Sequence, residues 1–166
     1  ESLDESLDLA KFLSNNKPIG HKSLIITNAG GPGVLLTDLL IENNIELVKI
    51  PSNLKFSFLW SNNNPIDVLG DATSRRFQEV FSRLKKEKKF YDNVIIILTP
   101  QDMTDVLNIA NEIINFNKEI NANVMCCLLG YESFKSAREI LEKNNINCFN
   151  NIGKIAKVLK NGNSQS

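Results

Sequence analysis

The apolar run from Val94 to Leu98, which follows Asn93, constrains the fold more than any other stretch of the chain. It is rich in β-branched residues and shows no alternation of apolar and polar positions. A strand of this kind is typical of a sheet buried on both faces, and such sheets are parallel and covered by helices. The run therefore predicts a central strand of a parallel sheet.

Four further strands are predicted around it, each followed by a segment with apolar residues at helical spacing. The strands are expected at 23–26, 45–50, 93–98, 123–129 and 146–149, and the helices at 34–42, 73–84, 106–116, 133–142 and 152–159. Five rounds of this alternation predict an α/β fold, a doubly wound parallel five-stranded sheet in a three-layer α/β/α arrangement. The expected strand order is 2-1-3-4-5.

The 166 residues are expected to form one domain with flanking segments. We predict a lead-in helix and linker over 1–18, the α/β domain over 19–160 and a disordered tail over 161–166. The chain begins with Glu rather than Met, so we expect it to be a piece of a longer protein.

Composition excludes several classes of partner. Lys+Arg and Asp+Glu are equal at 19 each, which argues against a nucleic-acid or anionic-membrane surface. No segment is apolar enough to span a bilayer. Cys126, Cys127 and Cys148 fit reduced core residues of a cytoplasmic protein better than disulfides, and no metal cluster is expected.

A glycine-rich turn joins the first predicted strand to its helix. It runs Thr27-Asn28-Ala29-Gly30-Gly31-Pro32-Gly33-Val34. Glycine permits positive φ and close approach of another group, and proline fits the first turn of a helix. The free N–H groups at such a helix start form an anion site. The predicted phosphate-binding residues are Asn28, Gly30, Gly31, Pro32, Gly33 and Val34, and the alternative is a tight turn that binds nothing.

Topology favours the phosphate site over the empty turn. In the order 2-1-3-4-5, ligands bind beyond the carboxyl ends of strands 1 and 3, where the strand order reverses. The glycine turn lies at the first of these ends. The residues expected to line the crevice are Asn64, Asp67, Thr99, Gln101 and Thr104.

This set can hold an anion but offers nothing to transform it. It contains no histidine and no pair of carboxylates close in sequence. The single histidine, His21, precedes the first strand and is expected to be a surface residue. Asp67 and Asp102 could each act as a base, but an Asp after Pro or before a helix is more often a turn or capping residue, and this is what we expect of both. We therefore expect no catalytic residue in this chain.

Three separated motifs carry a resemblance to a known family. They are the glycine turn from Ile26 to Val34, the segment Asn64-Pro65-Ile66-Asp67-Val68-Leu69-Gly70-Asp71-Ala72 and the segment Ile97-Leu98-Thr99-Pro100-Gln101-Asp102-Met103-Thr104-Asp105. The chain resembles the nucleoside-diphosphate-forming acyl-CoA synthetases, typified by ADP-forming acetyl-CoA synthetase and related to succinyl-CoA synthetase. The likeness covers about residues 3–159 and includes the lead-in segment 7–11.

The resemblance implies a flavodoxin-like domain similar to the carboxyl-terminal domain of the succinyl-CoA synthetase β-subunit. Such enzymes interconvert acyl-CoA, ADP and phosphate with acid, CoA and ATP. A histidine on a neighbouring domain carries the phosphoryl group to an ATP-grasp domain, and the helix after Gly33 resembles one of two helices whose N-termini face that histidine. The implied partners are CoA-binding, phosphohistidine and ATP-grasp domains of the same enzyme.

The whole enzyme would use CoA, ADP or ATP and Mg²⁺, none of them bound tightly by this domain. His21 lies in the wrong context for the phosphorylated histidine, and the chain contains no ATP-grasp segment, so the isolated chain is expected to be an inactive part of an acid–CoA ligase. Two other interpretations remain. One is a stand-alone flavodoxin-like module for a nucleotide, flavin or CoA, and the other is a structural domain or the regulatory part of an acyltransferase fusion.

Overall fold

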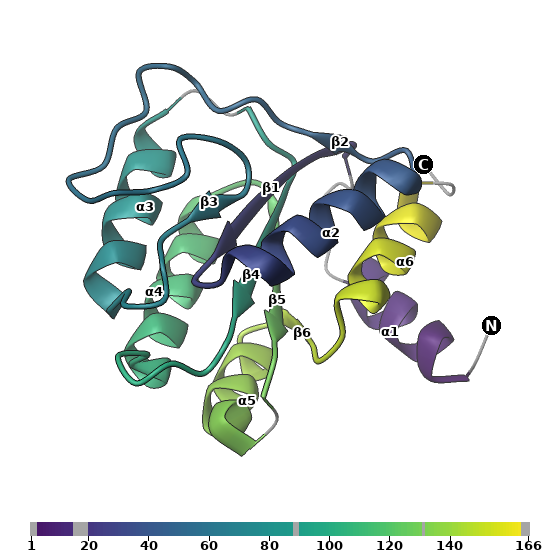
Figure 1. Cartoon of the computed structure of the whole chain (residues 1–166). Helices are drawn as coiled ribbons and strands as arrows, with labels where there is room; N and C mark the ends of the chain where they lie inside the picture. Colours follow the sequence, from purple (N-terminus) through teal and green to yellow (C-terminus); the bar gives the residue numbers. More distant parts are fainter. Residues whose placement is uncertain (1–2, 15–19, 88–89, 131, 164–166) are drawn as a thin grey trace.

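A computed structural model describes residues 3–14, 20–87, 90–130 and 132–163, and these residues form a parallel sheet between two layers of helices (Figure 1). The strands are β1 (Lys22–Thr27), β2 (Glu46–Leu47), β3 (Ile66–Asp67), β4 (Asn93–Leu98), β5 (Asn123–Leu128) and β6 (Asn147–Phe149). They are ordered β2-β1-β4-β5-β6, and β3 also pairs with β1. Counted over the five predicted strands, the predicted order is confirmed.

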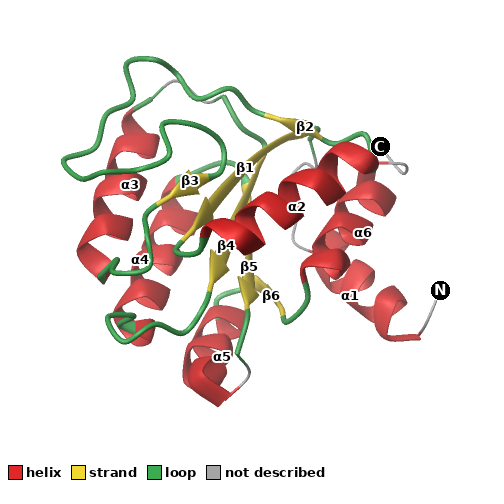
Figure 2. Cartoon of the chain, viewed as in Figure 1, coloured by secondary structure: helices red, strands yellow, loops and turns green. Residues whose placement is uncertain are grey.

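Helices cover both faces of the sheet, as Figure 2 shows in red on either side of the yellow strands. One face carries α1 (Leu3–Ser14), α2 (Gly30–Glu42) and α6 (Ile152–Asn163). The other carries α3 (Ser74–Lys86), α4 (Val106–Glu119) and α5 (Lys135–Lys143), with a short 3₁₀ turn, η1 (Glu132–Phe134), before α5. The three-layer arrangement is confirmed. No described helix is long and apolar enough to cross a membrane.

Successive residues of the central strands enter opposite cores. In β4, Ile96 packs in the cluster beneath α3 and α4, whereas Ile95 and Ile97 pack in the cluster beneath α2 and α6. Every residue of β4 and of β5 is buried. Because side chains alternate across a strand, burial on both faces requires the unbroken apolar run seen in the sequence.

The segments that flank the predicted domain take part in the packing. The α1 side chain of Phe12 is 2% exposed and lies in the same core cluster as α2 and α6. Helix α6 continues to Asn163, three residues into the segment predicted as a tail. Residues 15–18 of the predicted linker and 164–166 of the predicted tail lie outside the described residues.

The edge of β1 is completed by two short strands rather than by one long one. β2 pairs with the amino half of β1, where Ser23 is in register with Leu47, and β3 pairs with the carboxyl half, where Thr27 is in register with Asp67. The predicted strand 45–50 therefore forms over only two residues. The chain leaves the sheet after Val48 and returns at Ile66, from within a segment that the sequence predicts to be irregular.

The side chain of Asn64 bridges the gap between these two strands. Its Oδ1 accepts a hydrogen bond from Ile25 N at 3.0 Å, and its Nδ2 donates to Ser23 O at 2.9 Å and to Val48 O at 3.2 Å. The side-chain amide thus takes the place of a backbone peptide in the ladder. Asn64 was expected to line the crevice, but the structure places it within the sheet. Both polar atoms of its side chain are already hydrogen-bonded to the backbone there.

We predict that Asn64→Ala lowers the free energy of unfolding by about 2–4 kcal/mol, because it leaves buried backbone groups of β1 without partners. Urea denaturation of the chain measures this. The matched control is Asn63→Ala in the same asparagine run, where the side chain is exposed and accepts one local hydrogen bond. Equal losses in the two variants would contradict the bridging role.

Candidate functional site

Three loops meet at the carboxyl edge of the sheet, and each comes from one of the three sequence motifs. They follow β1, β3 and β4. Asn28 after β1 bonds Thr99 after β4, and a Cβ added to Gly70 after β3 would lie 3.8 Å from both Asn28 O and Gln101 Cδ. The motifs, although about 30–40 residues apart in sequence, therefore form one surface, as expected where the strand order reverses.

Asn28 holds two of these loops together. Its Nδ2 donates to Thr99 O at 2.9 Å and to Thr104 Oγ1 at 3.4 Å, and its Oδ1 accepts from Thr99 N at 2.9 Å. The residue is 1% exposed. Because both amide hydrogens are already donated, the Asn28 side chain positions the site and has no donor left for a ligand.

The loop after β4 is closed by its own polar groups. Gln101 N donates to Thr104 Oγ1 at 3.2 Å, Thr104 N donates to Gln101 O at 2.9 Å, and Gln101 Nε2 donates to Thr99 Oγ1 at 3.1 Å. The structure thus brings Thr99, Gln101 and Thr104 together, as the sequence analysis expected. Gln101 is exposed beside Gly70.

Helix α2 begins without a side-chain cap. Ala29 is the N-cap residue, and its N–H is bonded to Thr27 Oγ1 at 3.0 Å. Gly33 N donates to Ala29 O at 3.3 Å, and Pro32 has no N–H. The N–H groups of Gly30 and Gly31 belong to the first turn, where no intrahelical acceptor exists, and none is found among the described residues.

None of the three glycines of the turn has positive φ, and packing requires glycine at Gly33 but not at Gly31. Gly130 is the only described glycine with positive φ. A Cβ at Gly33 would lie 3.0 Å from Thr27 Cγ2 and 3.3 Å from Pro65 Cγ, so glycine lets α2 lie close against β1 and the loop before β3. A Cβ at Gly31 would meet nothing within 4 Å.

Gly31 also has a local reason to be glycine, because it is helical and precedes Pro32. A side chain before proline disfavours the helical region through a clash with the proline ring. The space over Gly31 nevertheless stays open on the side of the helix N-terminus. Val34, the last residue of the predicted phosphate set, is 57% exposed on the first turn of the same helix.

The loop after β3 is fixed to α3 by an arginine that the sequence analysis did not single out. Arg76 donates from Nη1 and Nη2 to the two Asp71 oxygens at 2.6 and 2.8 Å, and from Nη1 to Val68 O at 2.8 Å. The hydrogen bond from Arg76 lowers the pKa of Asp71. The signal in the sequence was an Asp five residues before an Arg, which alone does not indicate a pair.

Asp67 lies next to the start of α2. Its Oδ1 accepts from Leu69 N at 2.8 Å, and its Oδ2 would lie 3.0 Å from a Cβ on Gly30. Asp67 is therefore both the turn residue that the sequence predicts and a neighbour of the predicted phosphate site. The positive end of the helix dipole favours a carboxylate at this place.

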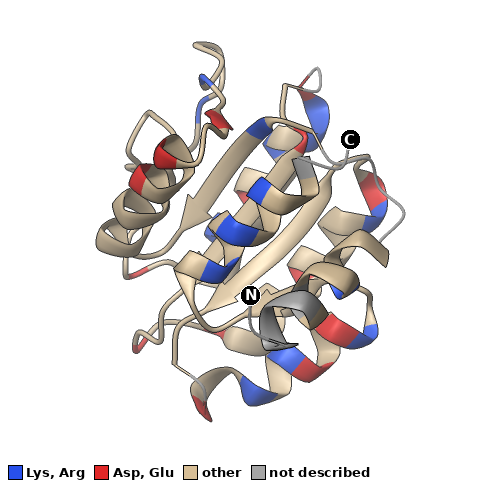
Figure 3. Ribbon diagram, turned by 90° about the vertical axis from the view of Figure 1, so that its right-hand side faces the viewer, with Lys and Arg blue, Asp and Glu red and all other residues tan. Residues whose placement is uncertain are grey.

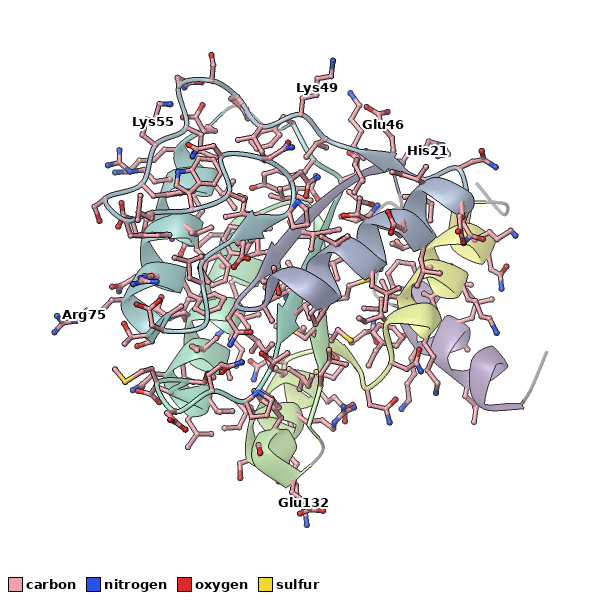
Figure 4. All side chains as sticks on the ribbon, in the orientation of Figure 1. His21, Glu46, Lys49, Lys55, Arg75 and Glu132 are labelled. Carbon is pink, nitrogen blue, oxygen red and sulfur yellow. The ribbon has the colours of Figure 1, made fainter. Side chains whose placement is uncertain are left out.

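The described residues near the site include no reactive nucleophile or metal cluster. Burial raises the pKa of the Cys127 thiol to about 12, and a hydrogen bond to Cys148 and burial raise the pKa of Cys126. No group of three or more His, Cys, Asp or Glu residues is placed to hold a metal ion in the described part of the chain. His21 is exposed at the amino end of β1, near Glu46 and away from the glycine turn (Figure 4).

Comparison with known proteins identifies this arrangement. The Ligase-CoA domain family matches residues 23–159, which include all three motifs. The chain belongs to this family. The glycine turn and the loops after β3 and β4 all lie inside the region that matches the Ligase-CoA domain.

The similar proteins with assigned names are ligases. The chain is 31% identical to acetate–CoA ligase (ADP-forming) I of Archaeoglobus fulgidus over 157 residues, which cover 87% of this chain and 21% of the relative. It is 29% identical to 4-hydroxybutyrate–CoA ligase (ADP-forming) of Nitrosopumilus maritimus over 152 residues, which cover 88% of this chain and 22% of the relative. This Ligase-CoA domain therefore spans about a fifth of the length of these relatives.

Solved structures share the fold over nearly the whole chain. A crystal structure of a protein from Pyrococcus horikoshii OT3 superposes with a TM-score of 0.83 at 28% identity, covering 99% of this chain and 40% of that protein. The dinucleotide-forming acetyl-coenzyme A synthetase 1 of Ca. Korarchaeum cryptofilum gives a TM-score of 0.84 at 24% identity, covering 99% of this chain and 38% of that chain.

We predict that Gly33→Ala destabilises the chain by about 1–3 kcal/mol, because the added methyl group meets buried Thr27 and the Pro65 ring. Gly31→Ala is the matched comparison in the same turn. Its change should stay below about 1 kcal/mol, since better helix propensity offsets the strain before proline. Urea denaturation measures both, and a larger loss for Gly31→Ala would refute the assigned packing roles.

Proposed function

We propose that this chain is one domain of an ADP-forming acyl-CoA synthetase, which interconverts acyl-CoA, ADP and phosphate with acid, CoA and ATP. In this proposal the N-terminus of α2 binds the phosphoryl group of a phosphohistidine carried by a neighbouring domain. The family membership and the names of the relatives support the reaction class. The observation that carries the role of this domain is the pair of unpaired N–H groups at Gly30 and Gly31, with open space over Gly31.

The contribution of the chain is binding and orientation. Two adjacent N–H groups suit two oxygens of one phosphoryl group, and the helix dipole stabilises the negative charge there. The loops after β3 and β4 are tied down by Arg76 and Asn28, so the donors are held in place before the phosphoryl group arrives. Preorganised donors of this kind stabilise the charge that develops during transfer.

An exposed apolar rim around the site suits contact with another domain. Its members come from α2, the loops after β3 and β4 and the start of α4, and they are 38–57% exposed. They are Val34, Leu35, Leu69, Met103 and Leu107. Apolar side chains that gather around a polar site are typical of surfaces that meet a partner. The proposed partner is the domain that carries the histidine, and CoA-binding and ATP-grasp domains complete the enzyme.

The other ligands of the reaction are assigned to those domains. No group of three or more His, Cys, Asp or Glu residues that could hold Mg²⁺ lies among the described residues, and we assign Mg²⁺, CoA and ADP to the other domains. When bound elsewhere in the enzyme, ADP accepts the phosphoryl group, Mg²⁺ offsets its charge and CoA carries the acyl group. The present chain only binds and orients the phosphoryl group during its transfer.

We predict that Gly31→Ala in the full-length enzyme lowers ATP formation from acyl-CoA, ADP and phosphate by roughly 10²-fold, because the added methyl group keeps the phosphoryl group away from the N–H donors, an effect comparable to the loss of one oxyanion donor. Side chains of a helix tilt toward its N-terminus, so the methyl group projects into the proposed phosphoryl position. Turnover assays measure the loss, and circular dichroism checks the fold. The control is Ile41→Ala, at a residue that is 59% exposed in the last turn of the same helix, far from the glycine turn. A fully active, folded Gly31→Ala enzyme would contradict the proposed role of the α2 N-terminus.

We also predict that the isolated chain forms no ATP and is not phosphorylated when given acyl-CoA, ADP and labelled phosphate. His21 and the glycine turn lie at opposite ends of β1, and six residues of a strand span roughly 20 Å. That separation excludes direct transfer between them. Labelled phosphate on His21, located by mass spectrometry, would disprove the proposed division of roles.

A further inference from the structure

A second polar cavity lies at the opposite edge of the sheet from the glycine turn, beside the edge strand β6. Its volume is about 480 Å³, and it is enclosed by α1, α5, β6 and the start of α6. None of the residues of the predicted phosphate site or of its crevice lines it. It is therefore a separate feature of the domain, and the proposed phosphoryl transfer does not use it.

Two residues in the lining of this cavity each have a buried side-chain donor without an acceptor. Arg138 donates from Nη1 to Cys148 O at 3.0 Å, and the same nitrogen lies 3.6 Å from Glu142 Oε1. Arg138 Nη2 and Asn147 Nδ2 are buried and make no hydrogen bond to any described residue. Buried donors are almost always paired in folded proteins, so two unpaired ones in one cavity indicate that an acceptor is supplied from outside the chain.

The charges around the cavity indicate that this acceptor is an anion. Lys11, Arg138 and Lys154 line it together with a single acidic residue, Glu142. The guanidinium group is a planar fork that matches the two oxygens of a carboxylate or phosphate. Figure 3 shows Asp and Glu as well as Lys and Arg on this side of the molecule, although the charged residues of α6 are all lysines. This pattern suits a small anion better than a polyanion.

The shape of the wall limits the size of the ligand further. Among the described residues of the lining, Phe149 is the only aromatic one, and it is 3% exposed, so its ring offers no face on which a nucleotide base could stack. The remaining lining is largely asparagine amide, which hydrogen-bonds to oxygen atoms. A small oxyanion without a base fits this lining.

We propose that the cavity between α1, α5 and β6 binds a small oxyanion, a carboxylate or a phosphate, through Arg138 and Asn147, with Lys11 at its rim. Arg138 also holds the carbonyl of Cys148 in the edge strand. Occupation of the cavity therefore ties α5 and β6 to α1, which contributes Lys11 from its last turn. The ligand would stabilise the edge of the sheet that lies farthest from the glycine turn.

The test is a titration of the ¹⁵N-labelled chain with inorganic phosphate and, separately, with malonate, at constant ionic strength. We expect saturable shifts of the Asn147 side-chain amide and of the Arg138 guanidinium signals. Saturation by phosphate alone identifies a phosphate site, and saturation by malonate alone identifies a carboxylate site. Shifts at Arg138 and Asn147 that saturate with neither probe would overturn the proposal.

Variants separate this site from the glycine turn. Asn147→Asp keeps the side-chain shape but adds a negative charge, so binding should weaken by at least about tenfold. Lys11→Gln should weaken it by about two- to fivefold, as expected for a partly exposed charge, and tests the site even where Asn147→Asp fails to fold. The control is Lys135→Gln, which lies on α5 like Arg138 but is not part of the cavity lining.

The two proposals fail independently. Phosphate-induced shifts at Gly30 and Gly31 that persist in Asn147→Asp report the glycine turn, whereas shifts lost in Asn147→Asp report the cavity beside β6. Binding left unchanged by both Asn147→Asp and Lys11→Gln would contradict the cavity proposal and leave the phosphoryl role of α2 as it stands.

Discussion

Two asparagine side chains act in place of backbone peptides and fix β1 to the segments beside it. Asn64 completes the hydrogen-bond ladder of β1 in the gap between β2 and β3, where no backbone of a neighbouring strand lies beside it. Asn28 does the same at the carboxyl end of β1, where it bonds both the N–H and the carbonyl of Thr99. An asparagine amide carries the same donor and acceptor as a peptide group, which explains why this residue type occupies both positions. The glycine turn, the start of α2 and the loop after β4 all depend on these bonds.

The layers and the strand order could be predicted from the sequence because they follow from long, strongly patterned segments. The runs at β4 and β5 are apolar at successive positions, and only a sheet buried on both faces accommodates them. The two-residue strand β3 could not be predicted, because its pairing depends on Asn64 filling the gap beside it. A strand of two residues is too short to leave a period in its own sequence.

The site was predictable in outline and less so in detail. The motifs after β1, β3 and β4 meet where the topology requires, and Thr99, Gln101 and Thr104 lie together there. The sequence could not reveal that the Asn28 amide is fully used inside the protein. The position of Asn64 within the sheet and the bond between Arg76 and Asp71 were equally hidden. The bonds of Asn28 and Asn64 join residues that are distant in sequence, and the spacing of Asp71 and Arg76 alone does not indicate a pair.

Pro32 determines which backbone N–H donors remain at the start of α2. Most helices begin with several N–H groups arranged around the axis, so an anion can sit over the end of the helix. Here proline removes the third donor, and the Gly33 N–H is already bonded to Ala29 O. The remaining donors, at Gly30 and Gly31, lie together on one side of the axis. An anion held by them is therefore off-centre, and the group that carries it has to approach from that side, past the carboxylate of Asp67. In the proposed phosphoryl site, the turn would therefore select an angle of approach as well as a charge.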